Sequence, residues 1–347
     1  MAKILIGLLF GGSSEEHTVS INSAAAILQA LQAGDNSYKY DVIPIYIQKN
    51  GIWIAGKIAE QVLETKKPLP TLSLKKEDKF QLWQFPTEVS QIDVWFPVLH
   101  GPNGEDGTIQ GLLKLMQVPF VGANVLGSAV SMDKIIMKTI FSQMELPQVK
   151  YLTFEYSNTK YCSQLSDDIR TNFGYPCFVK PANLGSSVGV SKVYSHNELD
   201  IALKNAASYD NRLIIEEGIV ARELECGVLG NDIPKVSVIG EITFENDFYD
   251  YEAKYKDSSS KIHIPAKLPD HIIEKIQQIA IRAFTGINCK GLARVDFFYV
   301  EETQEIFINE INSFPGFTEF SMYPKLWMQT GLSFNELVDE LIELALK

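Results

Sequence analysis

The chain has 347 residues, which is enough for two or three domains, and its 46% hydrophobic and 21% charged residues are typical of a folded protein. This composition excludes a disordered, collagen-like or disulfide-scaffold protein. The excess of 43 acidic over 31 basic residues gives a net charge of −12, so we expect binding neither to nucleic acid nor to an anionic membrane surface.

Cysteine spacing and hydropathy indicate the cellular compartment. The four cysteines, Cys162, Cys177, Cys226 and Cys289, are far apart and form no metal-binding motif, so we expect reduced thiols. No apolar stretch approaches the roughly 18 residues of a membrane span, and the short apolar run after Lys3 has no small-residue cleavage pattern. We therefore expect a cytoplasmic protein.

The first 121 residues alternate short apolar runs with amphipathic ones. Strands are expected at 4–10, 41–47, 92–99 and 119–121, and helices at 20–33, 108–116 and, beyond this unit, 128–144. Ser20 or Asn22 is placed to cap the first helix. Strands that alternate with helices predict an open parallel sheet covered by helices on both faces, so we expect an N-terminal α/β domain over 1–121.

The rest of the chain predicts two further units, 122–212 and 213–347, and a mixed α/β and α+β fold class. In the second unit, strands are expected at 150–154, 177–180 and 190–194, and helices at 165–172 and 198–207. In the third unit, strands are expected at 213–217, 223–229, 236–241, 291–300 and 305–311, and helices at 270–285 and 334–346. The polar segment 246–264 has no clear periodicity, which is typical of a functional lid or of a disordered loop.

The last two predicted strands carry polar side chains among apolar ones. Asp296 follows Arg294 by two residues, and Asn312 follows Glu310 by two, so each pair shares one face of its strand. Asp296, Glu310 and Asn312 offer the oxygen ligands that Mg²⁺ takes. The alternative is a solvated sheet face with an Arg294–Asp296 ion pair, which we consider weaker because Ile, Val and Phe surround these positions.

Four other segments combine loop residues with charge. A strand ends at Lys180 and continues into a Gly/Ser loop containing Gly185 and Gly189, which predicts converging backbone N–H groups around an anion. Glu216 ends another strand. The glycine-rich turns 11–20 and 100–107 both follow strands of the first unit, at the edge where open α/β sheets bind ligands.

Several motifs taken together resemble the D-alanine–D-alanine ligase family of ATP-grasp enzymes. They are HGPNGEDGTIQG, SMDK, VKPANLGSSVGVSKV, FYDYEAKY, RVDFF and NEINSFPGFTEFS, in the family's order and over nearly the whole chain. The resemblance implies a three-domain ATP-grasp fold, in which an N-terminal substrate-binding domain is followed by two domains that clasp ATP. It also implies ATP-dependent ligation of two D-alanine molecules through an acyl phosphate, for peptidoglycan precursor synthesis, by a homodimer.

The same resemblance implies roles for individual residues. ATP would be bound by Lys134, Phe178, Lys180, Ser186, Ser187, Glu216, Glu217, Gly218, Ile219, Glu223, Lys254, Phe298, Asn309 and Glu310. Two Mg²⁺ or Mn²⁺ ions would be held by Asp296, Glu310 and Asn312. The catalytic residues would be Glu16, Ser186, Tyr255, Arg294 and Gly316. The D-alanine substrates would contact Glu16, His100, Arg294, Gly316, Ser321 and Met322.

Within this scheme, Glu216 and the backbone around Gly218 and Ile219 would read adenine. Phe178 and Phe298 would sandwich the base, and Lys254 would reach the γ-phosphate. Glu223 has the better spacing for ribose, with Glu225 as a second acidic candidate. The base that deprotonates the second amine stays open.

Three alternatives remain. D-lactate or D-serine could be the second substrate, although Glu252-Ala-Lys254-Tyr255 resembles the alanine-specific ligases. A non-catalytic ATP-sensing module would lose Glu16, Arg294 or Ser321, and all three are present. A carboxylate ligase for another substrate would match in its ATP-binding half and differ in the turns of the first unit.

Overall fold

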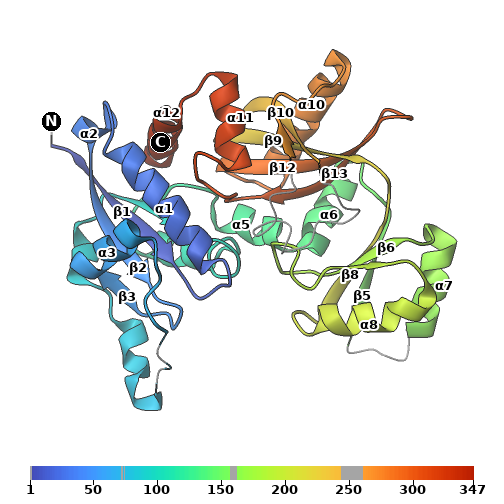
Figure 1. Ribbon diagram of the computed structural model, residues 1–347, viewed down its shortest axis with the longest axis horizontal. Helices are drawn as coiled ribbons and strands as arrows, with labels where there is room; N and C mark the ends of the chain where they lie inside the picture. Colours follow the sequence, from blue (N-terminus) through green and yellow to red (C-terminus); the bar gives the residue numbers. More distant parts are fainter. Residues whose placement is uncertain (1, 72, 74, 157–161, 244–260) are drawn as a thin grey trace.

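A computed structural model describes residues 2–71, 73, 75–156, 162–243 and 261–347. Three β-sheets form three lobes: in Figure 1 the first sheet lies at the left, the second at the lower right and the third at the upper right. In the part of the chain described, no helix has the length and apolar character that crossing a membrane requires.

The first sheet has the strand order β3-β2-β1-β4. Its strands are β1 (Ile4–Gly11), β2 (Tyr40–Ile47), β3 (Trp53–Ala55) and β4 (Val94–Val98). Its helices are α1 (His17–Leu31), α2 (Asn36–Lys39), α3 (Lys57–Thr65) and α4 (Thr108–Leu115), with short 3-10 helices η1 (Lys76–Trp83) and η2 (Thr87–Gln91). Strands β1, β2 and β4 are parallel, as the alternation of strands and helices predicted, and β3 adds an antiparallel edge.

Alternating side chains of β1 face opposite sides of this sheet. Ile6, Leu8 and Phe10 belong to a core that α1, α3 and the C-terminal helix complete, whereas Leu9 belongs to a second core with residues of α4. Helices on both faces are therefore confirmed.

Two predicted elements of this region differ from the structure. The segment 119–121 makes only one bridge, between Trp95 and Phe120. The helix expected over 128–144 is divided at Asp133 into α5 (Val125–Met132) and α6 (Lys134–Gln143). Asp133 is extended, with ψ of 99°, and its side chain accepts hydrogen bonds from the N–H groups of Ile135 and Ile136, so it ends one helix and caps the next.

The start of α1 also differs from the prediction. The helix begins at His17, ahead of both expected caps. Ser20 lies inside α1, where its hydroxyl donates to the carbonyl of Val98 and accepts from the N–H of Gly11 at 2.8 Å. Ser20 therefore ties the glycine turn to the neighbouring strand rather than capping the helix.

The second sheet is antiparallel, with the order β5-β8-β6-β7. Its strands are β5 (Tyr151–Glu155), β6 (Cys177–Pro181), β7 (Ser191–Val193) and β8 (Arg212–Glu217). The helices α7 (Cys162–Asn172) and α8 (His196–Ala207) complete its core.

The third sheet is also antiparallel, with the order β11-β10-β9-β12-β13. Its strands are β9 (Arg222–Gly230), β10 (Lys235–Thr243), β11 (Lys261–His263), β12 (Gly291–Val300) and β13 (Glu305–Asn312). Its helices are α10 (Asp270–Gly286), α11 (Met322–Thr330) and α12 (Phe334–Leu346). The core of this sheet includes residues of α6 and α10, while α12 packs into the core of the first sheet.

These pairings move the expected domain boundaries. Strand β8 pairs with β5 and β6, so a boundary after residue 212 separates it from its own sheet. Ala123, Val130, Met137 and Phe141 are buried in the core of the third sheet rather than the second. We propose that the second unit runs from about residue 150 to Glu217, and that α5 and α6 belong to the third unit.

Candidate active site

A cleft of about 590 Å³ lies where the three sheets meet, and all three sheets or their loops contribute to its walls. Most of the residues predicted from the sequence line it. They are Glu16, His100, Lys134, Phe178, Lys180, Ser186, Ser187, Glu216, Glu217, Ile219, Glu223, Arg294, Asp296, Phe298, Asn309, Glu310, Asn312 and Gly316. Gly218, Ser321 and Met322 are not part of the lining, and Lys254 and Tyr255 lie outside the described residues, as does most of the expected lid.

Strands β12 and β13 bring the predicted oxygen ligands together. Their register pairs Asp296 with Glu310 and Arg294 with Asn312. The register shifts after Asp296, so that Phe297 pairs with Ile308 and Asn309 is the extra residue of a bulge. Asp296 and Glu310 therefore lie side by side on neighbouring strands of the third sheet.

The donor set fits a magnesium ion that is shared with a phosphate. Two carboxylates and one amide supply fewer ligands than the six that Mg²⁺ takes, so substrate oxygens and water would complete the shell. Within the described residues, no group of three or more His, Cys, Asp or Glu side chains is arranged to hold a metal alone. Here, cations balance the carboxylates: Arg294 contacts Asp296, and the Nζ atom of Lys134 lies 3.8 Å from Glu310.

Arg294 is held between carboxylates on two strands. Its Nε and Nη2 atoms donate to Oδ1 and Oδ2 of Asp296, both at 2.7 Å, and Nε lies 2.9 Å from Oε2 of Glu225. Burial lowers the pKa of the guanidinium, but Asp296 and Glu225 raise it well above its usual value. Arg294 is therefore a fixed positive charge in the cleft wall.

The opposite wall carries lysines around a buried carboxylate. The carboxylate of Glu216 on β8 lies 2.5 Å from Nζ of Lys180 and 3.0 Å from Nζ of Lys138. Burial raises the pKa of Glu216, but the two lysines lower it to about 2, so the group is ionised. Glu216 thus positions two lysines. Because its carboxylate is already engaged in these ion pairs, adenine would have to contact Glu216 alongside the two lysines.

Lys138 is a further cleft-wall residue, not predicted above, although the sequence contains a signal for it. Lys138 follows Lys134 by four residues on α6, and this spacing places both on one helix face. Lys134 donates to the carbonyl of Leu184 at 2.7 Å, and Lys138 reaches Glu216 deeper in the wall.

The predicted adenine-binding backbone is only partly available. The N–H of Gly218 donates to the carbonyl of Pro176 at 2.9 Å, and a Cβ atom at this position would lie 2.7 Å from the same oxygen. Gly218 is therefore packed against the loop before β6, and its N–H is already hydrogen-bonded. Ile219 does line the cleft, as do Phe178 and Phe298 from different sheets.

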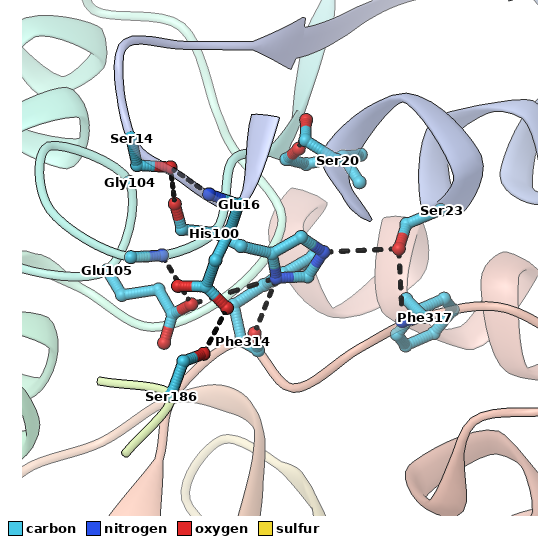
Figure 2. Close-up of polar contacts among 12 residues, drawn as sticks. Ser14, Glu16, Ser20, Ser23, His100, Gly104, Glu105, Ser186, Phe314 and Phe317 are labelled. Carbon is cyan, nitrogen blue, oxygen red and sulfur yellow. Dashed lines mark hydrogen bonds and ion pairs between the residues drawn. The ribbon is translucent and has the colours of Figure 1, made fainter. Parts of the chain in front are cut away.

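The turns 11–20 and 100–107 of the first unit meet the Gly/Ser loop that follows Lys180, at one end of the cleft (Figure 2). The hydroxyl of Ser186 donates to Oε1 of Glu16 at 2.6 Å. A Cβ atom at Gly101 would lie 2.6 Å from Oε2 of Glu16, so a glycine there leaves room for the carboxylate. Ser186 and Ser187 have φ of 55° and 57°, a left-handed conformation that non-glycine residues keep mainly where the surroundings impose it.

His100 links this end of the cleft to the loop after β13 (Figure 2). Its Nδ1 atom lies 3.2 Å from the carbonyl of Phe314, which can only accept, so Nδ1 carries the proton. Nδ1 also lies 3.7 Å from Glu105. Burial lowers the pKa of His100, but Glu105 raises it, and the net direction is upward.

Ser23 and Glu105 are further residues that the sequence analysis did not identify. The hydroxyl of Ser23 lies 3.1 Å from Nε2 of His100 and accepts from the N–H of Phe317 at 3.3 Å. Phe317 directly follows Gly316, the predicted oxyanion donor. Ser23 thus connects α1, His100 and the Gly316 loop through one atom.

Ser321 and Met322 begin α11 beside the cleft. The hydroxyl of Ser321 accepts from the N–H of Thr318 at 3.0 Å and lies 3.3 Å from the position a Cβ atom would take at Gly316. Met322 is buried. The predicted carboxylate-binding serine is therefore next to the predicted oxyanion donor, at the edge of the lining.

The two antiparallel sheets contribute lysines to one wall of the cleft and paired carboxylates to the other, and several solved structures are similar to the chain over nearly its whole length. This combination defines an ATP-grasp enzyme. Two family models match the chain: "D-ala D-ala ligase N-terminus" over residues 5–123 and "D-ala D-ala ligase C-terminus" over residues 140–343. The chain belongs to the D-alanine–D-alanine ligase family.

Similar proteins span the full length of the chain. A D-alanine–D-alanine ligase of Synechococcus sp. (strain CC9311) is 50% identical over 99% of this chain and 98% of its own length. The structure of the VanG D-Ala:D-Ser ligase from Enterococcus faecalis is 36% identical with a TM-score of 0.83, covering 99% of this chain and 100% of that one. The D-alanine–D-alanine ligase from Coxiella burnetii is 35% identical with a TM-score of 0.79, covering 99% and 94%.

Proposed function

We propose that the protein joins two molecules of D-alanine to D-alanyl-D-alanine, with ATP converted to ADP and phosphate, for peptidoglycan precursor synthesis. The observation that carries this proposal is the placement of Arg294, Asp296 and Glu310 on paired strands, facing a wall of lysines across one cleft. Membership of the ligase family supports the same reaction.

The first chemical step has to make a carboxylate reactive. A carboxylate is a poor acyl donor, so the γ-phosphoryl group of ATP is transferred to the first D-alanine to give an acyl phosphate. Lys134 and Lys180 hold phosphate oxygens in line with the attacking carboxylate, and Ser186 and Ser187 close over them. Asp296, Glu310 and Asn312 would hold Mg²⁺, which supplies charge neutralisation of the phosphates when bound.

The second step forms the peptide bond. The amine of the second D-alanine attacks the acyl phosphate, and negative charge develops on the carbonyl oxygen. Arg294 and the N–H of Gly316 stabilise this oxyanion. Glu16 holds the ammonium group of the first D-alanine, with His100 beside it, and Ser321 and Met322 contact the second substrate.

Residues outside the described part complete the proposal. Lys254 would reach the γ-phosphate, and Tyr255 would orient the substrates together with Glu16 and Ser186. Lid closure would exclude water, which hydrolyses acyl phosphates.

D-Serine as second substrate is the nearest competitor, because the VanG protein named above is a D-Ala:D-Ser ligase. D-Alanine remains our proposal for both positions. The 50% identical relative is a D-alanine–D-alanine ligase, and the sequence Glu252-Ala-Lys254-Tyr255 resembles the alanine-specific enzymes.

Two properties of the assembled enzyme belong to the same proposal. Family resemblance favours a homodimer, which sedimentation or light scattering of the purified chain would test. Dependence on ATP favours action in the cytoplasm, where ATP is supplied.

Replacement of Arg294 by Ala tests the proposed chemistry. We expect turnover to fall by two orders of magnitude or more, since one oxyanion donor contributes about 3 kcal/mol to transition-state stabilisation. ADP affinity, measured by calorimetry, should change little. Unchanged turnover in a variant with a normal unfolding transition would remove Arg294 from the oxyanion role.

A further inference from the structure

Glu225 extends the row of carboxylates by one strand. The register pairs Glu225 on β9 with Asp296 on β12, and Asp296 with Glu310 on β13. All three residues line the cleft, and Glu225 is only 7% exposed. An acidic side chain buried this deeply needs a nearby positive charge.

Arg294 supplies that charge and shares it with Asp296. Its Nε atom is 2.9 Å from Glu225 and 2.7 Å from Asp296, and Nη2 donates to the second oxygen of Asp296. That second oxygen also accepts from the amide of Asn312 at 2.9 Å. Both oxygens of Asp296 are therefore already hydrogen-bonded in this structure.

This arrangement conflicts with metal binding unless Arg294 has another partner. A metal ion at Asp296 would take lone pairs from the oxygens that Arg294 now uses, and it would bring positive charge close to the guanidinium. Arg294 would then be a buried cation with a weakened counter-ion, which is costly. Glu225 is a carboxylate already in contact with the same guanidinium nitrogen.

We propose that Glu225 is a positioning residue that holds Arg294 when Asp296 turns to the metal. This inference rests on the proposed function. Glu225 keeps the guanidinium fixed beside the reacting carbonyl group and reduces competition between Arg294 and the metal for Asp296. Ribose binding, the other role considered for Glu225, fits less well, because its carboxylate is already in contact with Arg294.

A double-mutant cycle tests this role through metal affinity. The variants are Glu225→Gln, Arg294→Met and the double variant, and the readout is Mn²⁺ binding to the protein with ADP, followed by electron paramagnetic resonance. We expect Glu225→Gln to weaken Mn²⁺ binding about tenfold. We expect no further loss from Glu225→Gln when Arg294 is already Met, because Glu225 acts through Arg294.

An equal loss in both backgrounds would overturn the proposal, because Glu225 would then act on the metal directly. No loss in either background would also overturn it. If Glu225→Gln does not fold, Glu225→Asp replaces it. The shorter side chain keeps the charge but retracts it from Arg294, so the same dependence on Arg294 is expected.

Two controls separate this inference from the proposed function. Asp296→Asn should reduce Mn²⁺ binding; if it does not, the proposed metal site is wrong, whatever Glu225 does. Glu241→Gln removes a carboxylate from another arginine pair on the same sheet, in which Arg222 donates to Glu241 at 2.8 Å. We expect Glu241→Gln to leave Mn²⁺ affinity unchanged. Glu225→Gln, in addition to weakening Mn²⁺ binding, should lower kcat more than it changes the KM for D-alanine.

Discussion

Glu216 illustrates how a single buried charge determines the shape of the cleft wall. Its carboxylate fixes Lys138 from α6 and Lys180 from β6, so one acidic group orients cations from two elements. A neutral side chain here would deprive both lysines of their nearest counter-ion. Breaking a buried ion pair from one side costs about 3–5 kcal/mol in proteins.

Glu216→Gln should therefore lower the free energy of unfolding by about 3–5 kcal/mol. Since the lysines depress the pKa of Glu216 to about 2 in the folded protein, below its unfolded value near 4.3, its stabilisation is complete above about pH 4.3. It is lost as the pH falls from there through 2. Urea denaturation at several pH values should show this acid-dependent loss in the wild type and a smaller loss in the variant.

The charge-balanced double variant Glu216→Gln/Lys138→Met provides the control. It should recover part of the lost stability, because one of the two uncompensated cations is removed. If the double variant is no more stable than Glu216→Gln, the loss does not arise from unpaired charge.

Residue roles that depend on distant partners could not be predicted from the sequence. Lys138 and Ser23 each contact a residue more than 70 positions away, and no short segment contains both partners. Asp296 and Glu310, in contrast, each lie two residues from another polar side chain of the same strand, Arg294 and Asn312 respectively. This local pattern on adjacent strands was enough to predict that they lie together.

At the scale of elements, the division between α5 and α6 places the first lysine of the cleft. Asp133 ends α5, caps α6 and contacts Arg212 of β8, so Lys134 is the first residue of α6. The N–H of Lys134 donates to the carbonyl of Ala182, which anchors this helix end to the second sheet. A continuous helix over 128–144 would turn this side chain elsewhere.

Asp133→Ala should reduce stability by about 1–2 kcal/mol through the lost cap, and should raise the KM for ATP severalfold because Lys134 moves. Ser333→Ala is a matched control, because Ser333 caps α12 with a capping box, and α12 carries none of the proposed site residues. It should cost similar stability without changing that KM. Equal stability losses with an unchanged KM in both variants would contradict the positioning role of Asp133.

Periodicity predicted most elements correctly but not their pairing. The apolar runs at 4–10, 41–47 and 291–300 are strands close to their expected bounds. Strand β8 pairs with β5 and β6, and its Leu213 and Ile215 are buried in the core of that sheet, a packing that no short segment encodes. The cap at Asp133 had a local signal, an Asp directly before a helical run, but the surrounding apolar pattern continued through it.

At the scale of the molecule, the first and third units share an aromatic core. Phe314 and Phe317, in the loop after β13, pack with the first-sheet core, and Phe317 contacts Phe96 of β4. The same loop carries Gly316 and accepts a hydrogen bond from His100. The end of the cleft around Glu16 and His100 is therefore built jointly by the first and third units. The hydrogen bond from Ser186 to Glu16 adds the second unit to this end.

We propose above that this shared cleft makes a peptide bond between two D-alanines. The test incubates the full chain with ATP, Mg²⁺ and D-alanine, then identifies the products by mass spectrometry and measures phosphate release. Parallel reactions replace D-alanine by L-alanine, or add D-serine or D-lactate to D-alanine. We predict D-alanyl-D-alanine with one phosphate per dipeptide and no product from L-alanine. The absence of this dipeptide, or a mixed D-serine or D-lactate product as the main species at neutral pH, would contradict the account.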